Sequence, residues 1–279
     1  MRDRIIREPV VAGAFYPADP SKLSRQIEKL LRSVTPVKEP RPYQIGAVVP
    51  HAGYRYSGPV AAYSYSAISS YNPKDVILVG PSHREYFLGC SVFNGDAVKT
   101  PLGEVPVNNS LVEKLVHSDD SVNAGQQGHS AEHALEVQLP FLQSIYNHKF
   151  TVTLITMGDQ SRKTVQTLAR ALKSIWKQEI LVLASSDLSH YYSYDKAVAM
   201  DSTFGNLVER YDIQGLWRAM ERHEVEACGF GPVMTLLKLG EYLGNKESEI
   251  YRYMNSGDVT GDRKQVVGYL AAGVYAHTP

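Results

Sequence analysis

The chain has 279 residues, and its 29 lysines and arginines are balanced by 29 aspartates and glutamates. Without net charge it has no overall field to hold a nucleic acid, so we expect no direct nucleic-acid binding. The N-terminus is charged throughout, unlike a signal peptide, and no stretch is long and apolar enough for a membrane span. We therefore expect a cytoplasmic protein without membrane association.

Alternating helices and strands are predicted along most of the chain. A first helix, capped by Asp19 or Ser21, is predicted from apolar residues between Leu23 and Leu31. Strands are predicted over residues 45–49, 76–79, 90–98, 150–156, 180–184, 250–255 and 265–275. Further helices are predicted near residues 59–69, 109–117, 130–146 and 161–177 and through residues 196–243.

This alternation is typical of an α/β fold. We predict a layered αβα sandwich, in which helices cover both faces of a mostly parallel or mixed central sheet. The passage over residues 35–44 is rich in proline and charge but too short to predict a domain linker. The sequence shows no internal repeat or break in composition, so we predict a single domain over residues 1–279.

Histidines follow three of the predicted buried strands. His51 comes directly after the strand that ends at Val49 and Pro50, His83 lies four residues past Val79, and His190 lies shortly beyond the strand over residues 180–184. If these strands are parallel neighbours, their carboxyl ends share the sheet edge where α/β proteins bind ligands. The pattern predicts that the three imidazoles converge, although each could also be an isolated histidine bonded to a loop carbonyl.

A cluster of imidazoles is typical of a metal site, which often includes an anionic ligand as well. Cys228 precedes a predicted helix with Pro232 near its start. The helix dipole there should lower the pKa of the thiol and favour the thiolate. We predict Cys228 as a metal ligand, with a buried packing role as the alternative, and a packing role for Cys90.

The segment GHSAEHALEVQLPFL carries a second group of polar residues. On a helix, His129 and His133 would share one face, and Glu132 and Glu136 another. The HxxxH spacing lacks the glutamate of a zinc-protease motif, so this interpretation is weak. We predict instead that Glu132, His133 and Glu136 overlook the same sheet edge and hold a substrate or orient a ligand, with a solvated surface as the alternative.

Seven motifs, spread from about Gly13 to the C-terminus, together resemble the Memo family: GAFYPAD, PHAGYRYSG, GPSH, EHALEVQLP, SSDLSH, CGFGP and VVGYLAAG. Microbial members of this family are called protein B of the AmmeMemoRadiSam system. The ordered set is more specific than any single motif. The family is similar in turn to the extradiol, ring-cleaving non-haem iron dioxygenases.

The resemblance implies roles for four residues. By position, His51 and His83 match the two histidine ligands of Fe(II) in those dioxygenases, and Cys228 stands where their glutamate ligand would be. His190 matches the histidine that handles protons. Because a thiolate is softer than a carboxylate, the exchange shifts the preference towards copper, zinc or a differently poised iron and puts ring cleavage itself in doubt. The expected cofactor is a divalent metal, iron or copper, with zinc as the alternative.

The leading hypothesis is a metal-dependent, dioxygenase-like redox enzyme of unknown substrate. His190 would be its acid or base, and Asp187, expected in the same loop after the strand over residues 180–184, would orient an imidazole. Tyr54 and Tyr56 are predicted to wall a pocket, and Ser82 to contact the substrate or support a ligand. The resemblance further implies a functional link to a radical-SAM protein.

Two other functions remain open on the sequence. One is a hydrolase that uses zinc-bound water or the thiol of Cys228 as the nucleophile. The other is a catalytically silent adaptor that binds a peptide or a small molecule, because a pocket does not by itself prove turnover.

Overall fold

The computed structural model describes residues 3–35, 44–244 and 246–276. Residues 36–43, most of the proline-rich passage noted above, lie outside these ranges. Four parallel strands form the centre of a mixed sheet, in the order β2 (Gln44–Val49), β9 (Ile180–Ser185), β3 (Asp75–Pro81) and β8 (Thr151–Met157). Nearly all of their side chains are buried, as expected when both faces of a parallel sheet are covered.

The sheet continues on both sides of this parallel centre with strands that include antiparallel pairs. Beyond β8, the chain adds β4 (Cys90–Phe93), antiparallel to β8, and then β7 (Val122–Gly125). Beyond β2, the long strand β12 (Val266–Tyr275) pairs antiparallel with β2, β10 (Asp187–Tyr192) and β11 (Glu247–Asn255). A separate small sheet contains β1 (Ile6–Arg7), β5 (Ala97–Thr100) and β6 (Gly103–Pro106).

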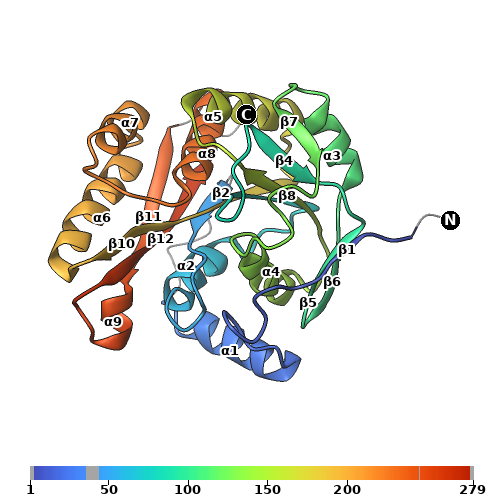
Figure 1. Ribbon diagram of the computed structural model, residues 1–279. Helices are drawn as coiled ribbons and strands as arrows, with labels where there is room; N and C mark the ends of the chain where they lie inside the picture. Colours follow the sequence, from blue (N-terminus) through green and yellow to red (C-terminus); the bar gives the residue numbers. More distant parts are fainter. Residues whose placement is uncertain (1–2, 36–43, 245, 277–279) are drawn as a thin grey trace.

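Helices pack on both faces of the large sheet (Figure 1). One face is covered by α1 (Pro20–Arg32), α2 (Gly58–Ile68) and α4 (Leu139–Tyr146). The other is covered by α3 (Asn109–Val116), α5 (Arg162–Ile175) and α8 (Phe230–Tyr242). Over the β10–β12 region lie α6 (Tyr194–Glu209), α7 (Ile213–Glu221) and the short α9 (Ser256–Thr260). The predicted α/β fold with a mixed central sheet is confirmed.

The first helix shows how local chemistry sets an element of this fold. Asp19 caps α1, since its side chain accepts a hydrogen bond of 2.7 Å from the backbone N–H of Lys22. This is one of the two predicted caps, and it satisfies a backbone donor that the first turn leaves unpaired. Leu23 and Ile27 are one turn apart and fully buried, so they anchor the helix on α2 and α4.

Two local predictions were wrong. The helix expected over residues 130–146 begins only at a 3₁₀ turn, η1 (Glu136–Gln138), and residues 130–135 form a loop. The carboxylate of Glu132 accepts backbone N–H bonds within this loop, which competes with helix formation. The segment after β9 was expected to be a loop but is strand β10, because β12 supplies an antiparallel partner. No described helix is long and apolar enough to cross a membrane.

Candidate metal centre

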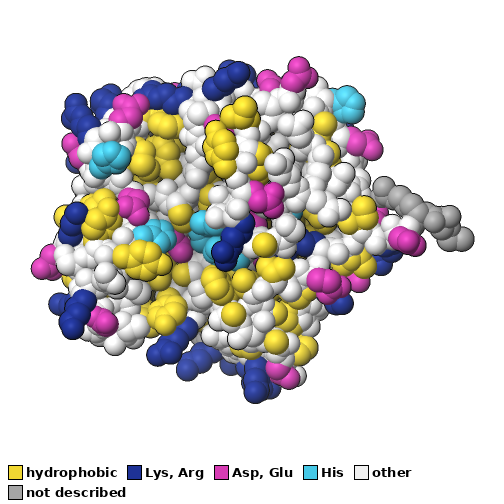
Figure 2. Space-filling view, viewed as in Figure 1, with side chains coloured by type: hydrophobic (Ala, Val, Ile, Leu, Met, Phe, Trp, Pro, Cys, Tyr) yellow, Lys and Arg dark blue, Asp and Glu magenta, His cyan; other side chains and the backbone are white. Residues whose placement is uncertain are grey.

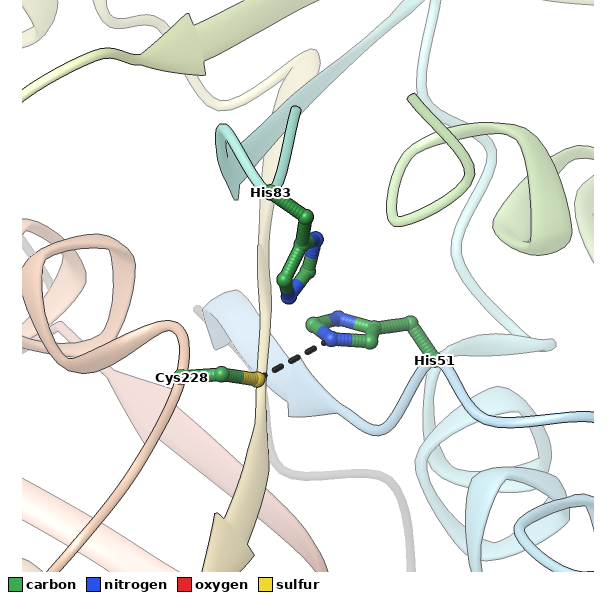
Figure 3. Close-up of side chains that lie close together, drawn as sticks. All are labelled: His51, His83 and Cys228. Atoms are coloured by element: carbon green, nitrogen blue, oxygen red, sulfur yellow. Dashed lines mark hydrogen bonds between the residues drawn. The ribbon is translucent and has the colours of Figure 1, made fainter. Parts of the chain in front are cut away.

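His51, His83 and Cys228 meet at the carboxyl edge of the parallel strands (Figure 3). His51 follows β2 and His83 follows β3, while β9 lies between these two strands. One ligand atom from each residue lies within 4.8 Å of the others, and Sγ of Cys228 lies 3.1 Å from Nε2 of His51. The three residues are therefore close enough to share one ion.

Hydrogen bonds determine which nitrogen of His51 is free. The Ser185 hydroxyl donates its proton to the carbonyl of Ala134 (2.8 Å), so towards Nδ1 of His51 (2.8 Å) it can only accept. Nδ1 must therefore carry the proton of the neutral ring. Burial and the neighbouring imidazole of His83 lower the pKa of His51 well below its usual value, which keeps the ring neutral. Nε2 then presents a lone pair to Cys228.

A carboxylate determines which ring nitrogen of His83 is free. Oε1 of Glu132 lies 2.9 Å from Nδ1 of His83, and Oε2 accepts the backbone N–H of the same residue at 2.6 Å. Although burial opposes ionisation of Glu132, its hydrogen bonds from His83 lower its pKa to about 2. An ionised carboxylate requires a proton on Nδ1, which leaves Nε2 of His83 free. Figure 3 shows a nitrogen of this ring directed towards the space between His51 and Cys228.

Cys228 reaches the site because Gly229 lets its loop lie against the end of β9. A Cβ atom at position 229 would be 2.1 Å from the carbonyl oxygen of Ser185, so a side chain there would push the loop away. Cys228 and Asp187 are also linked by three contacts. The N–H of Cys228 donates to the carbonyl of Asp187 (3.2 Å), Sγ accepts from the N–H of Asp187 (3.3 Å), and the thiol lies 3.6 Å from the same carbonyl as a donor.

The expected lowering of the Cys228 pKa was wrong. Burial and the nearby carboxyl group of Asp187 raise the pKa of the thiol instead. The residue precedes the cap Gly229 of α8 rather than lying in its first turn, where the dipole acts most strongly. Without a metal the thiol therefore keeps its proton, with Nε2 of His51 at 3.1 Å and the carbonyl of Asp187 at 3.6 Å as acceptors within reach, and a cation bound by Sγ would replace that proton.

Asp187 is buried beside this group and orients the backbone of His51 rather than its ring. Its Oδ1 accepts the backbone N–H of His51 at 2.8 Å. Burial raises the pKa of Asp187 to about 6, against the lowering effect of that hydrogen bond. The predicted orientation of an imidazole comes from Ser185 and Glu132 instead.

His190 lies on β10 and is not one of the three residues whose ligand atoms lie within 4.8 Å of one another. Its Nδ1 lies 3.5 Å from Oε1 of Glu226, and the same oxygen accepts its backbone N–H at 3.2 Å. This placement leaves its proton-transfer role a prediction.

The second polar segment divides between the site and the core. His133 lies beside the cluster, with its ring 4.8 Å from that of His83 and 5.5 Å from that of His51, and burial lowers its pKa to about 4. Glu136 points elsewhere: it accepts hydrogen bonds from Arg7, the N–H groups of Val10 and Val11, and the hydroxyl of Tyr16. It therefore ties down the N-terminal segment.

The remaining predicted site residues have different surroundings. Tyr54 is buried, donates to the carbonyl of Val137 (2.6 Å) and packs on Phe141, as a core residue does. Tyr56 is exposed, so its role as a pocket wall stays a prediction. The Ser82 hydroxyl donates to the carbonyl of Glu85 (2.5 Å), which shapes the loop that carries His83.

Four supporting residues were not predicted from the sequence: Ser185, Gln138, Glu226 and Arg7. Gln138 donates from Nε2 to Ser185 Oγ and to the carbonyl of Pro50, each at 3.0 Å. Ser185 and Gln138 stand inside the motifs SSDLSH and EHALEVQLP, so a signal for them was present. Arg7 and Glu226 contact their partners only through the fold, and no spacing indicated them.

The residues at this point fit a metal ion. Two imidazoles whose Nδ1 atoms are engaged, together with one thiol, form a donor set suited to iron, copper or zinc. Ring nitrogens held by a hydroxyl or a carboxylate are the usual support of metal-binding histidines. The structure thus supports a possible His-His-Cys metal site.

Replacing Ser185 by alanine or Glu132 by glutamine should each weaken metal binding by about 10- to 100-fold, because the first removes a partner that orients a ring and the second replaces a carboxylate by a weaker, neutral acceptor. Competition with a chromophoric chelator would measure the affinity. Glu113→Gln, on the exposed face of α3, is the matched control and should bind like the wild type. Unchanged affinity in both site variants would show that Ser185 and Glu132 do not orient the rings for metal binding.

The fold and the site define an α/β protein with a cluster of potential metal ligands at the carboxyl edge of its sheet. The chain belongs to the Memo-like protein family, whose model matches residues 7–273. A MEMO1 family protein of Sulfolobus acidocaldarius is 41% identical over 280 residues, covering 96% of this chain and 98% of its own. One from Thermoplasma volcanium is 37% identical over 266 residues, covering 95% and 97%.

The fold is also similar to that of a solved structure. The crystal structure of an uncharacterized protein, JW3007 from Escherichia coli K12, aligns with a TM-score of 0.59. The alignment covers 82% of this chain and 98% of that one at 12% sequence identity. At this identity the likeness concerns the fold alone.

Proposed function

We propose that this protein is a metal-dependent redox enzyme with dioxygenase-like chemistry, whose metal is held by His51, His83 and Cys228. The observation that carries the proposal is the state of the two rings: both Nδ1 atoms are engaged, and both Nε2 atoms are free beside one thiol. When bound, iron or copper would supply redox chemistry at this point, with three protein ligands leaving positions open.

His190 is the proposed acid or base. It lies on β10, three residues after Asp187, and is paired with Val267 of β12. Histidine is a common general acid or base in enzymes, which suits proton transfer to or from a substrate. His190 is not one of the three clustered residues, so a metal held by them would not occupy its ring nitrogens.

Exposed apolar side chains support the proposal that a small-molecule or peptide ligand binds here. Four of the large hydrophobic side chains exposed in the described residues follow His51, His83 or His190 by at most five residues: Tyr56, Tyr86, Leu88 and Tyr191. Figure 2 shows histidine side chains near the middle of one face, with apolar side chains around them. Such patches are typical of binding surfaces. A functional link to a radical-SAM protein is part of this proposal.

The contact between Cys228 and His51 also resembles the nucleophile–base pair of a cysteine hydrolase, which makes hydrolysis the second candidate. The raised pKa of Cys228 and the lowered pKa of His51 argue against it, since they favour the neutral thiol and imidazole over the thiolate and imidazolium that such a pair needs. A bound cation would instead stabilise the thiolate, so the same thiol suits a metal ligand better.

The first test is elemental analysis of protein purified without added metal, for which we expect iron or copper near one ion per chain. The second is His190→Asn, which should retain that metal but lose dioxygen consumption with candidate substrates. If this variant loses the metal, His190 is a ligand and a closed, zinc-type site is the better description. Full activity in the variant would remove His190 from the mechanism.

A further inference from the structure

Strand β10 is irregular around His190. Its pairing with β12 shifts register on both sides of this residue, between Asp187 and His190 and between His190 and Tyr192. Tyr191, in between, has a φ of 63°, which is uncommon for a bulky residue and costs conformational energy. Irregularities of this kind often re-aim a side chain beside a functional site. Something must hold His190 and its neighbours in this conformation.

The carboxylate of Glu226 holds both ends of the irregular stretch. Oε1 accepts the backbone N–H of His190 at 3.2 Å, and Oε2 accepts the hydroxyl of Tyr192 at 3.0 Å. Glu226 comes from the segment between α7 and α8, two residues before Cys228. It therefore connects the backbone of β10 to the loop that carries a proposed metal ligand.

We propose that Glu226 is the positioning residue for His190, selecting the tautomer that carries its proton on Nδ1. Oε1 of Glu226 lies 3.5 Å from Nδ1 of His190, and an acceptor oxygen at this position favours a proton on Nδ1 and leaves Nε2 as the nitrogen that exchanges protons. The inference rests on the proposed function, because it states how His190 would be held for proton transfer.

Other carboxylates near His190 are engaged by different donors. Asp187 accepts the backbone N–H of His51, and Asp201 accepts the N–H of Ser189 and the hydroxyl of Tyr253. Lys196 faces the outer side of this region, with its Nζ 4.2 Å from the centre of the Tyr192 ring. Glu226 is thus the carboxylate that lies within 4 Å of Nδ1, and its hydrogen bonds with the N–H of His190 and the hydroxyl of Tyr192 hold it there, unlike an isolated surface ion pair.

The test measures which ring nitrogen of His190 carries the proton, in the full chain prepared without metal. The protein is labelled with ¹⁵N-histidine, and long-range ¹H–¹⁵N spectra are recorded at a pH where His190 is neutral. Its signals among the nine histidines are assigned by their loss in His190→Asn. We expect the wild-type ring to carry its proton on Nδ1. In Glu226→Gln, which removes the charge, the ratio of the Nδ1–H to the Nε2–H form should fall about fivefold or more.

Glu224→Gln is the matched control, since Glu224 lies on the same segment and pairs with Arg222 on the surface at 3.9 Å. This variant should keep the wild-type ratio. Tyr192→Phe, which frees Oε2 of Glu226, should shift the ratio in the same direction as Glu226→Gln but less. An Nε2–H tautomer in the wild type, or no change in Glu226→Gln, would overturn the proposal, as would equal shifts in Glu226→Gln and Glu224→Gln.

The outcome is independent of whether the protein is a redox enzyme. The tautomer is measured without metal or substrate, so a protein that binds no iron or copper can still show the expected ratio. Metal content of Glu226→Gln, measured in parallel, should equal that of the wild type, because the carboxylate touches none of the three proposed ligands. Loss of metal in this variant would mean that Glu226 positions the Cys228 loop instead, and would overturn the assigned role.

Discussion

Replacing Arg7 by methionine is expected to lower the free energy of unfolding by about 3–5 kcal/mol, the usual cost of removing one partner of a buried ion pair. Nη1 of Arg7 lies 2.8 Å from Oε2 of Glu136, and the side chains of these residues are 7% and 0% exposed. Arg7 also donates from Nε to the carbonyl of His129 at 2.8 Å and from Nη2 to that of Glu132. The variant would leave a buried carboxylate and two carbonyls without this donor.

Urea unfolding followed by circular dichroism would measure this change. Arg4→Met is the matched control, because the Arg4–Glu104 ion pair at 3.0 Å is largely exposed and should contribute less than about 1 kcal/mol. The metal affinity of Arg7→Met should fall as well, since the loop it holds carries Glu132. Equal stability losses in the two variants would show that Arg7 is not the anchor of this loop.

Replacing Cys228 by serine is expected to weaken binding of iron or copper by more than about 100-fold, while the fold without metal keeps its stability. Removing a partner that only orients a ligand already costs about 10- to 100-fold in affinity, so loss of a direct soft ligand should cost more. Serine is close to cysteine in size, and the residue lies in a loop before α8 rather than within the core.

Metal content after dialysis and thermal melts with and without chelator would measure the two effects separately. Cys90→Ala is the control, because Cys90 is buried on β4 away from the site and should affect stability but not metal content. If Cys228→Ser instead melts far below the wild type in chelator, the thiol is a packing residue. The His-His-Cys site would then have to be abandoned.

Much of this fold was predictable because its signals are local. The parallel strands are short apolar runs rich in β-branched residues, and Asp19 caps α1 by accepting a hydrogen bond from the backbone N–H of Lys22, only three residues away. The approach of His51 to His83 also followed from the sequence. Both residues come directly after such strands, and parallel strands end at one edge.

The sequence by itself thus determined the four central parallel strands and most of the helices, and it placed His51 and His83 at one sheet edge. Tertiary structure alone decided how those imidazoles are held and what lies beside them. The pairs Arg7–Glu136, Ser185–His51 and Glu226–His190 join residues far apart in the chain, so no local spacing reveals them. The pKa of Cys228 was mispredicted for the same reason: a helix terminus is visible in sequence, whereas burial and the carboxyl group of Asp187 arise only when distant segments pack together.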